Sequence, residues 1–392
     1  YDPEAGNFPT SAVLLWTFIS IFALWIGISV VLYVYGQMKE QPVDVFDASE
    51  GVNGHSLTTS DLENGLEIVR PTQRATYKFF ALAIIVFGLQ VLAGVISATD
   101  FMAVPSASTL NRLLIPFSVS RSYHTLLQIF WFFMCWVGYT IFFLPRLAKV
   151  PKGQKFFINL LFFMACVVAV GAVSGIYVGQ RGWITNDELS YWFGSQGWEF
   201  IELGRFFQWV LLAGFTLWIF IIYRAVKPWL SRKNFWSVPA WLLWGSGVMV
   251  LFLFFSVLMV PEDNFAVSDY WRWMTVHMWV EVTFEVFTTV IVAYLLVQMG
   301  LVTRLMAERI IFLAVMLFLV TALNGISHNF YWIAKPTGII AVGSVFSTLQ
   351  VLPLLLLTLD AWQMRQEGGR ANTFRVQGKQ VEVMEGVWLF IL

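Results

Sequence analysis

The stretch Tyr270-Trp-Arg-Trp-Met-Thr-Val-His277-Met-Trp-Val-Glu281-Val-Thr-Phe-Glu285, continuing to Gln298, decides the fold. It is long and apolar enough to cross a bilayer as one helix, which takes about 20 residues. Yet it contains a histidine and two glutamates, and ionisable side chains inside a membrane are costly and therefore candidates for function. On an α-helix, residues four apart drift by only about 40°, so His277, Glu281 and Glu285 are expected to share one face. Such a face could offer a metal ion nitrogen and oxygen ligands together.

Composition places the chain among membrane proteins. It is 58% hydrophobic and 17% aromatic, with only 12% charged residues. This apolar content is far more than a soluble domain can bury. We therefore expect an all-α, polytopic transmembrane helical bundle. The formal net charge of zero argues against nucleic acid as a partner. Cys135 and Cys166 fall in apolar runs, which favours small core residues over a disulfide framework.

Apolar runs of spanning length define the expected helices. They cover residues 12–36, 77–98, 121–146, 156–178, 204–226, 237–260, 270–298, 306–333 and 338–362. The run 387–392 is expected to begin a further helix, so we expect a C-terminally truncated bundle. Residues 1–36 are predicted to hold an extra N-terminal transmembrane helix, residues 37–76 a polar cytoplasmic loop with a solvated His55, and residues 77–392 the partial main bundle.

Basic residues predict the orientation in the membrane, because loops rich in lysine and arginine face the cytoplasm. They gather in alternate loops, at Arg146, Lys149, Lys152 and Lys155, at Arg224, Lys227, Arg232 and Lys233, at Arg304 and Arg309, and at Arg365 and Arg370. With that orientation, His124, His277 and His328 are all expected at one depth, in the outer half of the bilayer.

Two further strings carry candidate ligands. Gly325-Ile-Ser-His328-Asn329-Phe-Tyr-Trp332 could be a polar helix end with interfacial aromatics, but together with His277 it offers a second nitrogen ligand. His124 precedes large apolar side chains, which suits either a core histidine or an axial haem ligand. The His277 face itself could be a structural pairing of a histidine with carboxylates. A second histidine at similar depth favours metal binding instead.

The order of these three elements resembles the haem–copper oxidase superfamily, and specifically its nitric oxide reductase branch. The family's string His-x-x-x-Glu-x-x-x-Glu matches His277, Glu281 and Glu285. The resemblance implies that His277, His328 and Glu281 bind a non-haem iron beside a high-spin haem b, since an added oxygen ligand suits iron. It further implies that Glu285 tunes the electrostatics of the site or relays protons, and that His124 holds a low-spin haem b. The remaining haem ligands are expected beyond residue 392.

The chain departs from the family's pattern in two places. The family's His-His pair reads His328-Asn329 here, so an amide replaces one iron ligand and would leave the iron under-coordinated or orient a bound molecule. Thr99 and Ala103 stand where quinol-dependent members carry a histidine and a glutamate that contact quinol. The extra first helix is nevertheless similar to the single-chain, quinol-dependent form. Because the quinol-contacting pair is missing, electron input from quinol is not expected.

Both departures resemble the proposed nitric oxide dismutases, which would convert two NO into N2 and O2 without an external electron donor. The first hypothesis is therefore an oxidoreductase that dismutates nitric oxide in a bacterial inner membrane, connected with denitrification. The second is quinol-dependent reduction of NO to N2O. The third, a proton or ion transporter that uses the His277 face as a relay, is less favoured because no internal repeat is evident.

A weaker match lies in the string Gln196-Gly-Trp-Glu199-Phe-Ile-Glu202-Leu-Gly-Arg205. Related reductases place a glutamate there that helps a calcium ion to bridge the haem propionates. The resemblance therefore implies calcium binding by Glu199. The alternative is an interfacial helix cap.

Overall fold

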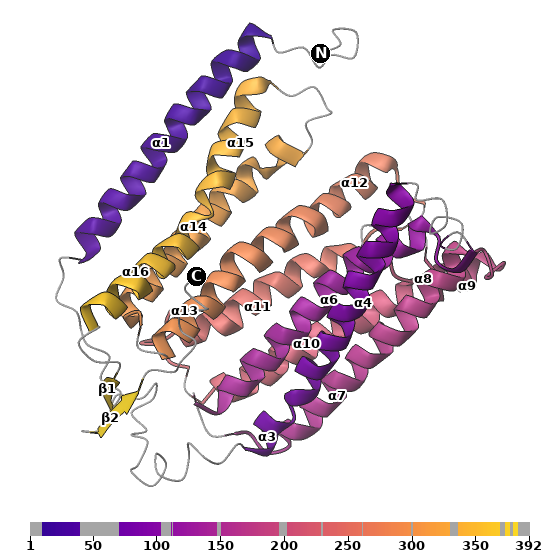
Figure 1. The fold of residues 1–392 in the computed structure, drawn as a ribbon, viewed down its shortest axis with the longest axis horizontal. Helices are drawn as coiled ribbons and strands as arrows, with labels where there is room; N and C mark the ends of the chain where they lie inside the picture. The colour runs from indigo at the N-terminus through magenta and orange to yellow at the C-terminus, as the bar shows by residue number, and fades with distance from the viewer. Residues whose placement is uncertain are drawn as a thin grey trace. The chain divides into compact units, whose positions relative to one another are not determined.

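The computed structural model describes residues 10–39, 70–102, 111, 113–146, 150–195, 202–228, 230–260, 262–298, 301–329, 336–368, 373–376 and 379–382. Almost all of this part of the chain is helical (Figure 1). The prediction of an all-α helical bundle is therefore confirmed. The chain divides into two compact units, residues 1–57, 232–245 and 277–392 in one, and residues 58–231 and 246–276 in the other. Most of the predicted loop 37–76, including His55, lies outside the described residues.

The second unit holds the helices from the first half of the chain. They are α3 (Pro71–Arg74), α4 (Tyr77–Phe101), α6 (Phe117–Phe143), η2 (Leu144–Arg146), α7 (Gln154–Val167), η3 (Val168–Ala172), α8 (Val173–Gln180), α9 (Asp187–Phe193), α10 (Arg205–Val226), most of α11 (Val238–Phe254), η4 (Phe255–Val257) and α12 (Phe265–Trp273). The η3 segment is a π-helical turn that joins α7 and α8 into one span.

The first unit holds the N-terminal helix and the helices from the second half of the chain. They are α1 (Ser11–Lys39), η6 (Val282–Phe287), α13 (Thr288–Gln298), α14 (Arg304–Asn329), α15 (Thr337–Leu349) and α16 (Leu352–Gly368). The π-helical segment η5 (Met274–Trp279) leads from α12 into this unit. Within the unit, α1 lies beside α15, and α15 packs against α14 (Figure 1).

Eight helices in the described part of the chain are long and apolar enough to cross a membrane. They span Ser11–Gln37, Pro71–Phe101, Phe117–Phe143, Gln154–Gln180, Arg205–Val226, Val238–Val257, Phe265–Val297 and Thr337–Trp362. These match eight of the nine predicted runs to within a few residues, and α14 is the long helix that corresponds to the remaining run, 306–333. The protein is therefore a multi-pass membrane protein.

Local sequence explains where several of these helices begin. Asn264 precedes α12, and its side chain accepts a hydrogen bond of 2.9 Å from the Ala266 amide. Asn186 caps α9 in the same way through the Leu189 amide. These caps satisfy amide groups that have no partner within the helix. Gly153 precedes α7 with a φ of 74°, a backbone conformation that a side chain would strain.

The last predicted run, 338–362, is broken into two helices. Helix α15 ends at Leu349, and α16 begins at Leu352. Pro353 is the second residue of α16, where its missing N–H costs nothing because the first turn of a helix has no internal acceptor for it. Sequence analysis also did not anticipate a short antiparallel hairpin, in which β1 (Thr373–Val376) pairs with β2 (Lys379–Glu382).

Candidate functional site

The histidine and the first glutamate of the 270–298 stretch meet in the structure. His277 Nε2 lies 2.6 Å from Glu281 Oε1. Each residue is only 7% exposed. Burying such a pair is costly unless the charges are compensated by each other or by a bound cation. The contact brings a nitrogen and an oxygen donor to one point, as predicted. It is also the contact that a purely structural pair would make.

The backbone at this pair is not the regular α-helix on which the prediction relied. The chain is π-helical over Met274–Trp279 and again over Val282–Phe287. A π-helical turn bonds residue i to i+5, so a spacing of four no longer returns as closely to the same face. The assumption of a continuous α-helical face is therefore wrong, although His277 and Glu281 still meet. Such π-helical turns are frequent at functional sites.

Glu285 is half-buried within the second π-helical segment. Its Oε2 atom is buried and has no hydrogen-bond partner among the described residues. Within the same part of the chain, no three histidine, cysteine, aspartate or glutamate side chains gather as a metal-binding group. Among the described residues, Glu285 therefore does not join His277 and Glu281 in a three-residue cluster, and its predicted role stays a prediction.

His328 and Asn329 are the last two residues of α14, and their side chains lie outside the described part of the structure. Glu199 and Ala103 lie outside it as well. Their assigned roles remain predictions. The common depth predicted for the three histidines also remains a prediction.

The donor set suits the iron that the resemblance implies. A histidine nitrogen and a carboxylate oxygen, with a second histidine, make the set that holds non-haem iron in many enzymes. The two donors described here meet each other in a buried place, and a further buried carboxylate oxygen, Glu285 Oε2, has no hydrogen-bond partner among the described residues. A bound cation would offset both the energetic cost of burying these groups and the negative charge of the carboxylates. His277 and Glu281 are thus the described residues that would hold it.

His124 is the eighth residue of α6 and faces α4. Its Nδ1 atom lies 3.0 Å from the main-chain oxygen of Gln90 and 2.9 Å from Nε2, the side-chain amide nitrogen of the same residue. A histidine whose Nδ1 is occupied in this way presents its other nitrogen, Nε2, for ligation. This arrangement fits an axial haem ligand.

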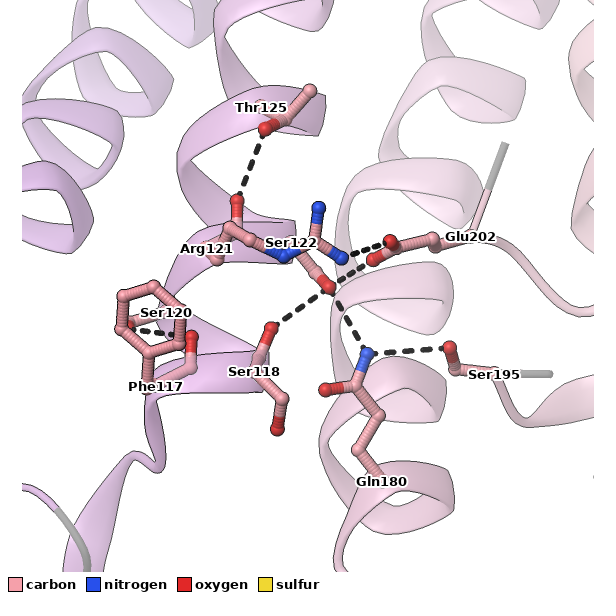
Figure 2. A network of polar contacts seen from close by, with 9 residues as sticks. All are labelled: Phe117, Ser118, Ser120, Arg121, Ser122, Thr125, Gln180, Ser195 and Glu202. Carbon is pink, nitrogen blue, oxygen red and sulfur yellow. Dashed lines mark hydrogen bonds and ion pairs between the residues drawn. The ribbon is translucent and has the colours of Figure 1, made fainter. Parts of the chain in front are cut away.

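A polar network occupies the N-terminal end of α6 (Figure 2). Arg121 Nη2 lies 2.5 Å from Glu202 Oε1, and the Ser122 hydroxyl donates to the other carboxylate oxygen. Gln180, at the end of α8, donates to Ser122 Oγ at 3.0 Å and to Ser195 Oγ at 3.4 Å. The network therefore joins α6, α8 and the segment before α10.

Sequence analysis singled out Glu199 in this segment and missed Glu202 as a site residue. Glu202 is 8% exposed, and its partners lie 80 and 81 residues earlier in the chain. No spacing rule relates such distant positions. The only available indication was a carboxylate next to an apolar run, with an arginine at the start of another.

Thr99, which stands where quinol-dependent members of the family carry a histidine, makes hydrogen bonds with neighbouring residues. Its hydroxyl donates to the Ile96 carbonyl at 2.8 Å, and Asn111 Nδ2 donates to Thr99 Oγ1 at 3.0 Å. Asn111 also donates to Asp100 Oδ1 at 3.2 Å, whereas Asp100 Oδ2 is buried with no hydrogen-bond partner among the described residues. The helix end therefore carries a carboxylate beside a threonine already occupied by its neighbours.

Comparison with known proteins defines the class. Residues 74–390 match the family model described as Cytochrome C and Quinol oxidase polypeptide I. The match covers most of the chain, so the chain belongs to this family of haem–copper oxidases and is an oxidoreductase. Within that class it is similar to a nitric oxide reductase subunit from Stutzerimonas stutzeri, with 27% identity over 336 residues. The alignment covers 82% of this chain and 67% of that relative. The resemblance inferred from the site motifs is thereby confirmed.

The network at Glu202 predicts a measurable loss of stability. We expect Glu202→Gln to lower the free energy of unfolding by about 1 kcal/mol, because the hydrogen bonds from Arg121 and Ser122 lose their charged acceptor. The effect is modest because the Arg121 side chain is half-exposed. Thermal unfolding of the detergent-solubilised protein would measure it. Glu188→Gln, at an exposed glutamate of α9, is the control and should change the unfolding temperature much less. Equal effects of the two substitutions would contradict this role of the network.

Proposed function

We propose that this protein acts on nitric oxide at a centre of high-spin haem b and non-haem iron in a bacterial inner membrane. The observation that carries the proposal is the buried contact of 2.6 Å between His277 Nε2 and Glu281 Oε1. A donor pair of this kind inside a membrane span is unusual and points to a cation. Similarity to a nitric oxide reductase subunit indicates the substrate class.

Each residue has a role in this proposal. His277, Glu281 and His328 hold the iron, and His124 holds a low-spin haem b from one side. Asn329 leaves the iron under-coordinated or orients bound nitric oxide. Glu285 tunes the charge of the site or relays protons, and its Oε2, which is buried with no hydrogen-bond partner among the described residues, supports this role. Glu199 takes part in binding a calcium ion near the haem propionates.

When bound, the haem and the iron supply neighbouring redox-active positions for two NO molecules, so that proximity replaces a bimolecular encounter. The chain's own contribution is to exclude water and to fix the ligands. The span that carries His277 and Glu281 is apolar, and each of the two residues is 7% exposed. A substrate that is small and uncharged can reach such a place without the help of polar groups.

Dismutation of NO is the reaction we favour. It converts two NO into N2 and O2, which balances atoms and electrons without an external donor. The hydroxyl of Thr99 is bonded within its own helix end, so it offers no base for quinol oxidation. Asn329 in place of a histidine alters the iron ligands, as would be expected for a different outcome at the metal.

Quinol-dependent reduction of NO to N2O is the second candidate, and one observation favours it. Asp100, next to Thr99, has a buried carboxylate oxygen with no hydrogen-bond partner among the described residues. A carboxylate in that place could accept a proton from quinol. It would replace the missing histidine and glutamate pair.

Supply of ¹⁵N-labelled NO to the intact membrane protein, without any electron donor, distinguishes the two reactions. We expect ¹⁵N-labelled N2 and unlabelled O2 to form in equal amounts. Mass spectrometry would measure both gases. Asp100→Asn should leave this yield unchanged. Labelled N2O that forms only when a quinol is added, and that is lost in Asp100→Asn, would overturn dismutation and select reduction.

A further inference from the structure

The helix pair α4 and α6 places two residues of α4 against the ring of His124. Gln90 is 8% exposed and contacts His124 Nδ1 through both its main-chain oxygen and its side-chain amide. Gly94 lies one turn further along α4, on the same face. A Cβ atom at residue 94 would lie 2.6 Å from His124 Nδ1 and 2.7 Å from Cε1. The imidazole therefore fits only because residue 94 has no side chain.

The two helices hold a fixed register around this ring. Towards one end of the pair, Ser97 Oγ donates to Ser120 Oγ at 2.9 Å. Towards the other end, the rings of Phe87 and Trp131 meet edge to face at 5.2 Å between centroids. Beyond them, the Phe80 ring approaches Gly138 so closely that a Cβ there would lie 2.9 Å from it. Neither helix can slide without breaking these contacts, so the place of the His124 ring is set by packing.

The two contacts at Nδ1 correspond to two tautomers of the imidazole. If Nδ1 carries the proton, it donates to the Gln90 carbonyl, and Nε2 keeps a lone pair for a metal. In that tautomer the side-chain amide of Gln90 is turned by 180°, so that Oε1 faces Nδ1–H. The oxygen and nitrogen ends of the amide have the same shape, so both orientations fit the same space. Only this tautomer can ligate through Nε2, and the main-chain oxygen of Gln90 favours it whichever way the amide points.

We propose that Gln90 and Gly94 are positioning residues for the low-spin haem, which fix the orientation and the tautomer of His124. The inference rests on the proposed role of His124 as a haem ligand. A hydrogen bond from the second nitrogen of a ligating histidine raises the basicity of the ligand and thereby lowers the reduction potential of the metal. Gln90 thus sets the potential of this haem, and Gly94 sets the plane of the ring.

The glycine is tested by comparing Gly94→Ala with Gly88→Ala in the intact membrane protein. Gly88 lies on the same helix, and a Cβ there would have no atom within 4 Å. We expect Gly94→Ala to lose or alter the low-spin ferric haem signal in electron paramagnetic resonance, whereas Gly88→Ala keeps it. Haem spectra that are the same in both variants would overturn the role of Gly94.

The glutamine is tested by a substitution that keeps its shape. Gln90→Glu would place a carboxylate opposite Nδ1–H, and we expect the midpoint potential of the low-spin haem to fall while that of the high-spin haem is unchanged. Gln90→Leu removes the side-chain contact and keeps the main-chain contact, so it should not lower the low-spin potential, and a fall as large as in Gln90→Glu would contradict the role of the carboxylate. An unchanged or raised potential in Gln90→Glu would overturn the role of Gln90.

The proposed ligand itself is tested separately by His124→Ala. The positioning role alone would be refuted if His124→Ala loses the low-spin haem but the other two variants are unaffected. In that case Gly94→Ala would keep its spectrum and Gln90→Glu would keep its potential. Retention of the low-spin haem in His124→Ala would refute the ligand assignment and, with it, the positioning role. The proposed reaction with nitric oxide is not decided by either result.

Discussion

Replacement of His277 with alanine is expected to remove the proposed non-haem iron and to lower the proposed turnover of nitric oxide by about a hundredfold or more, since loss of residues that merely support metal ligands costs 10–100-fold. The substitution also leaves the buried carboxylate of Glu281 without the imidazole that lies 2.6 Å away. Iron content of the intact protein by elemental mass spectrometry, together with gas production from labelled NO, would measure both effects.

Thr283→Val is the matched control for His277→Ala. Thr283 lies in the same pair of π-helical segments and is fully buried, and its hydroxyl has no hydrogen-bond partner among the described residues. Valine has nearly the same shape, so iron content and turnover should both persist. If His277→Ala keeps its full complement of iron, the metal assignment of the His277–Glu281 pair is wrong and the structural pairing stands.

Replacement of Arg205 with methionine is expected to produce the largest loss of stability. Arg205 is 3% exposed. It donates to Tyr191 Oη at 3.0 Å, Gln208 Oε1 at 2.9 Å and the Ser256 carbonyl at 3.4 Å, and also to the Met259 carbonyl. Methionine has a similar length but no donor, so these acceptors lose the hydrogen bonds that the guanidinium donates. We expect the free energy of unfolding to fall by about 3 kcal/mol or more.

The fork geometry of arginine matters as much as its charge, because it reaches acceptors on several elements at once. Arg205→Lys should therefore recover only part of the stability. Arg232→Met, at an exposed arginine, should cost less than about 0.5 kcal/mol. Unfolding by heat in detergent would rank the three variants. A methionine variant at residue 205 as stable as the one at residue 232 would contradict this account.

Much of the fold could be predicted because a bilayer imposes a simple rule. A span needs a run of apolar residues of set length, and its backbone must satisfy its own hydrogen bonds. The runs at 154–180 and 205–226 were therefore located almost to the residue. The hairpin at 373–382 was missed, although the string Thr373-Phe-Arg-Val-Gln-Gly378-Lys-Gln-Val-Glu382 carries a glycine between two short β-prone runs.

The site could be predicted only in part. His277 and Glu281 were recognised because an ionisable group in an apolar run is conspicuous in the sequence. Gln90 could have been noticed on the same ground, as a polar residue within an apolar span. Glu202 could not, because its partners Arg121 and Ser122 lie on another helix, and nothing local to either segment relates them.

The sequence by itself determined that this is a multi-pass helical membrane protein and that its motifs belong to the haem–copper oxidases. Both depend on patterns within single segments, which hydrophobicity and residue spacing record directly. Only the tertiary structure decided that the 270–298 helix carries π-helical segments on either side of Glu281, that Gln90 and Gly94 enclose His124, and that the network at Glu202 joins three segments. The enclosure of His124 and the network at Glu202 arise from packing between segments, where the deciding contact lies tens of residues away along the chain and leaves no period in either segment.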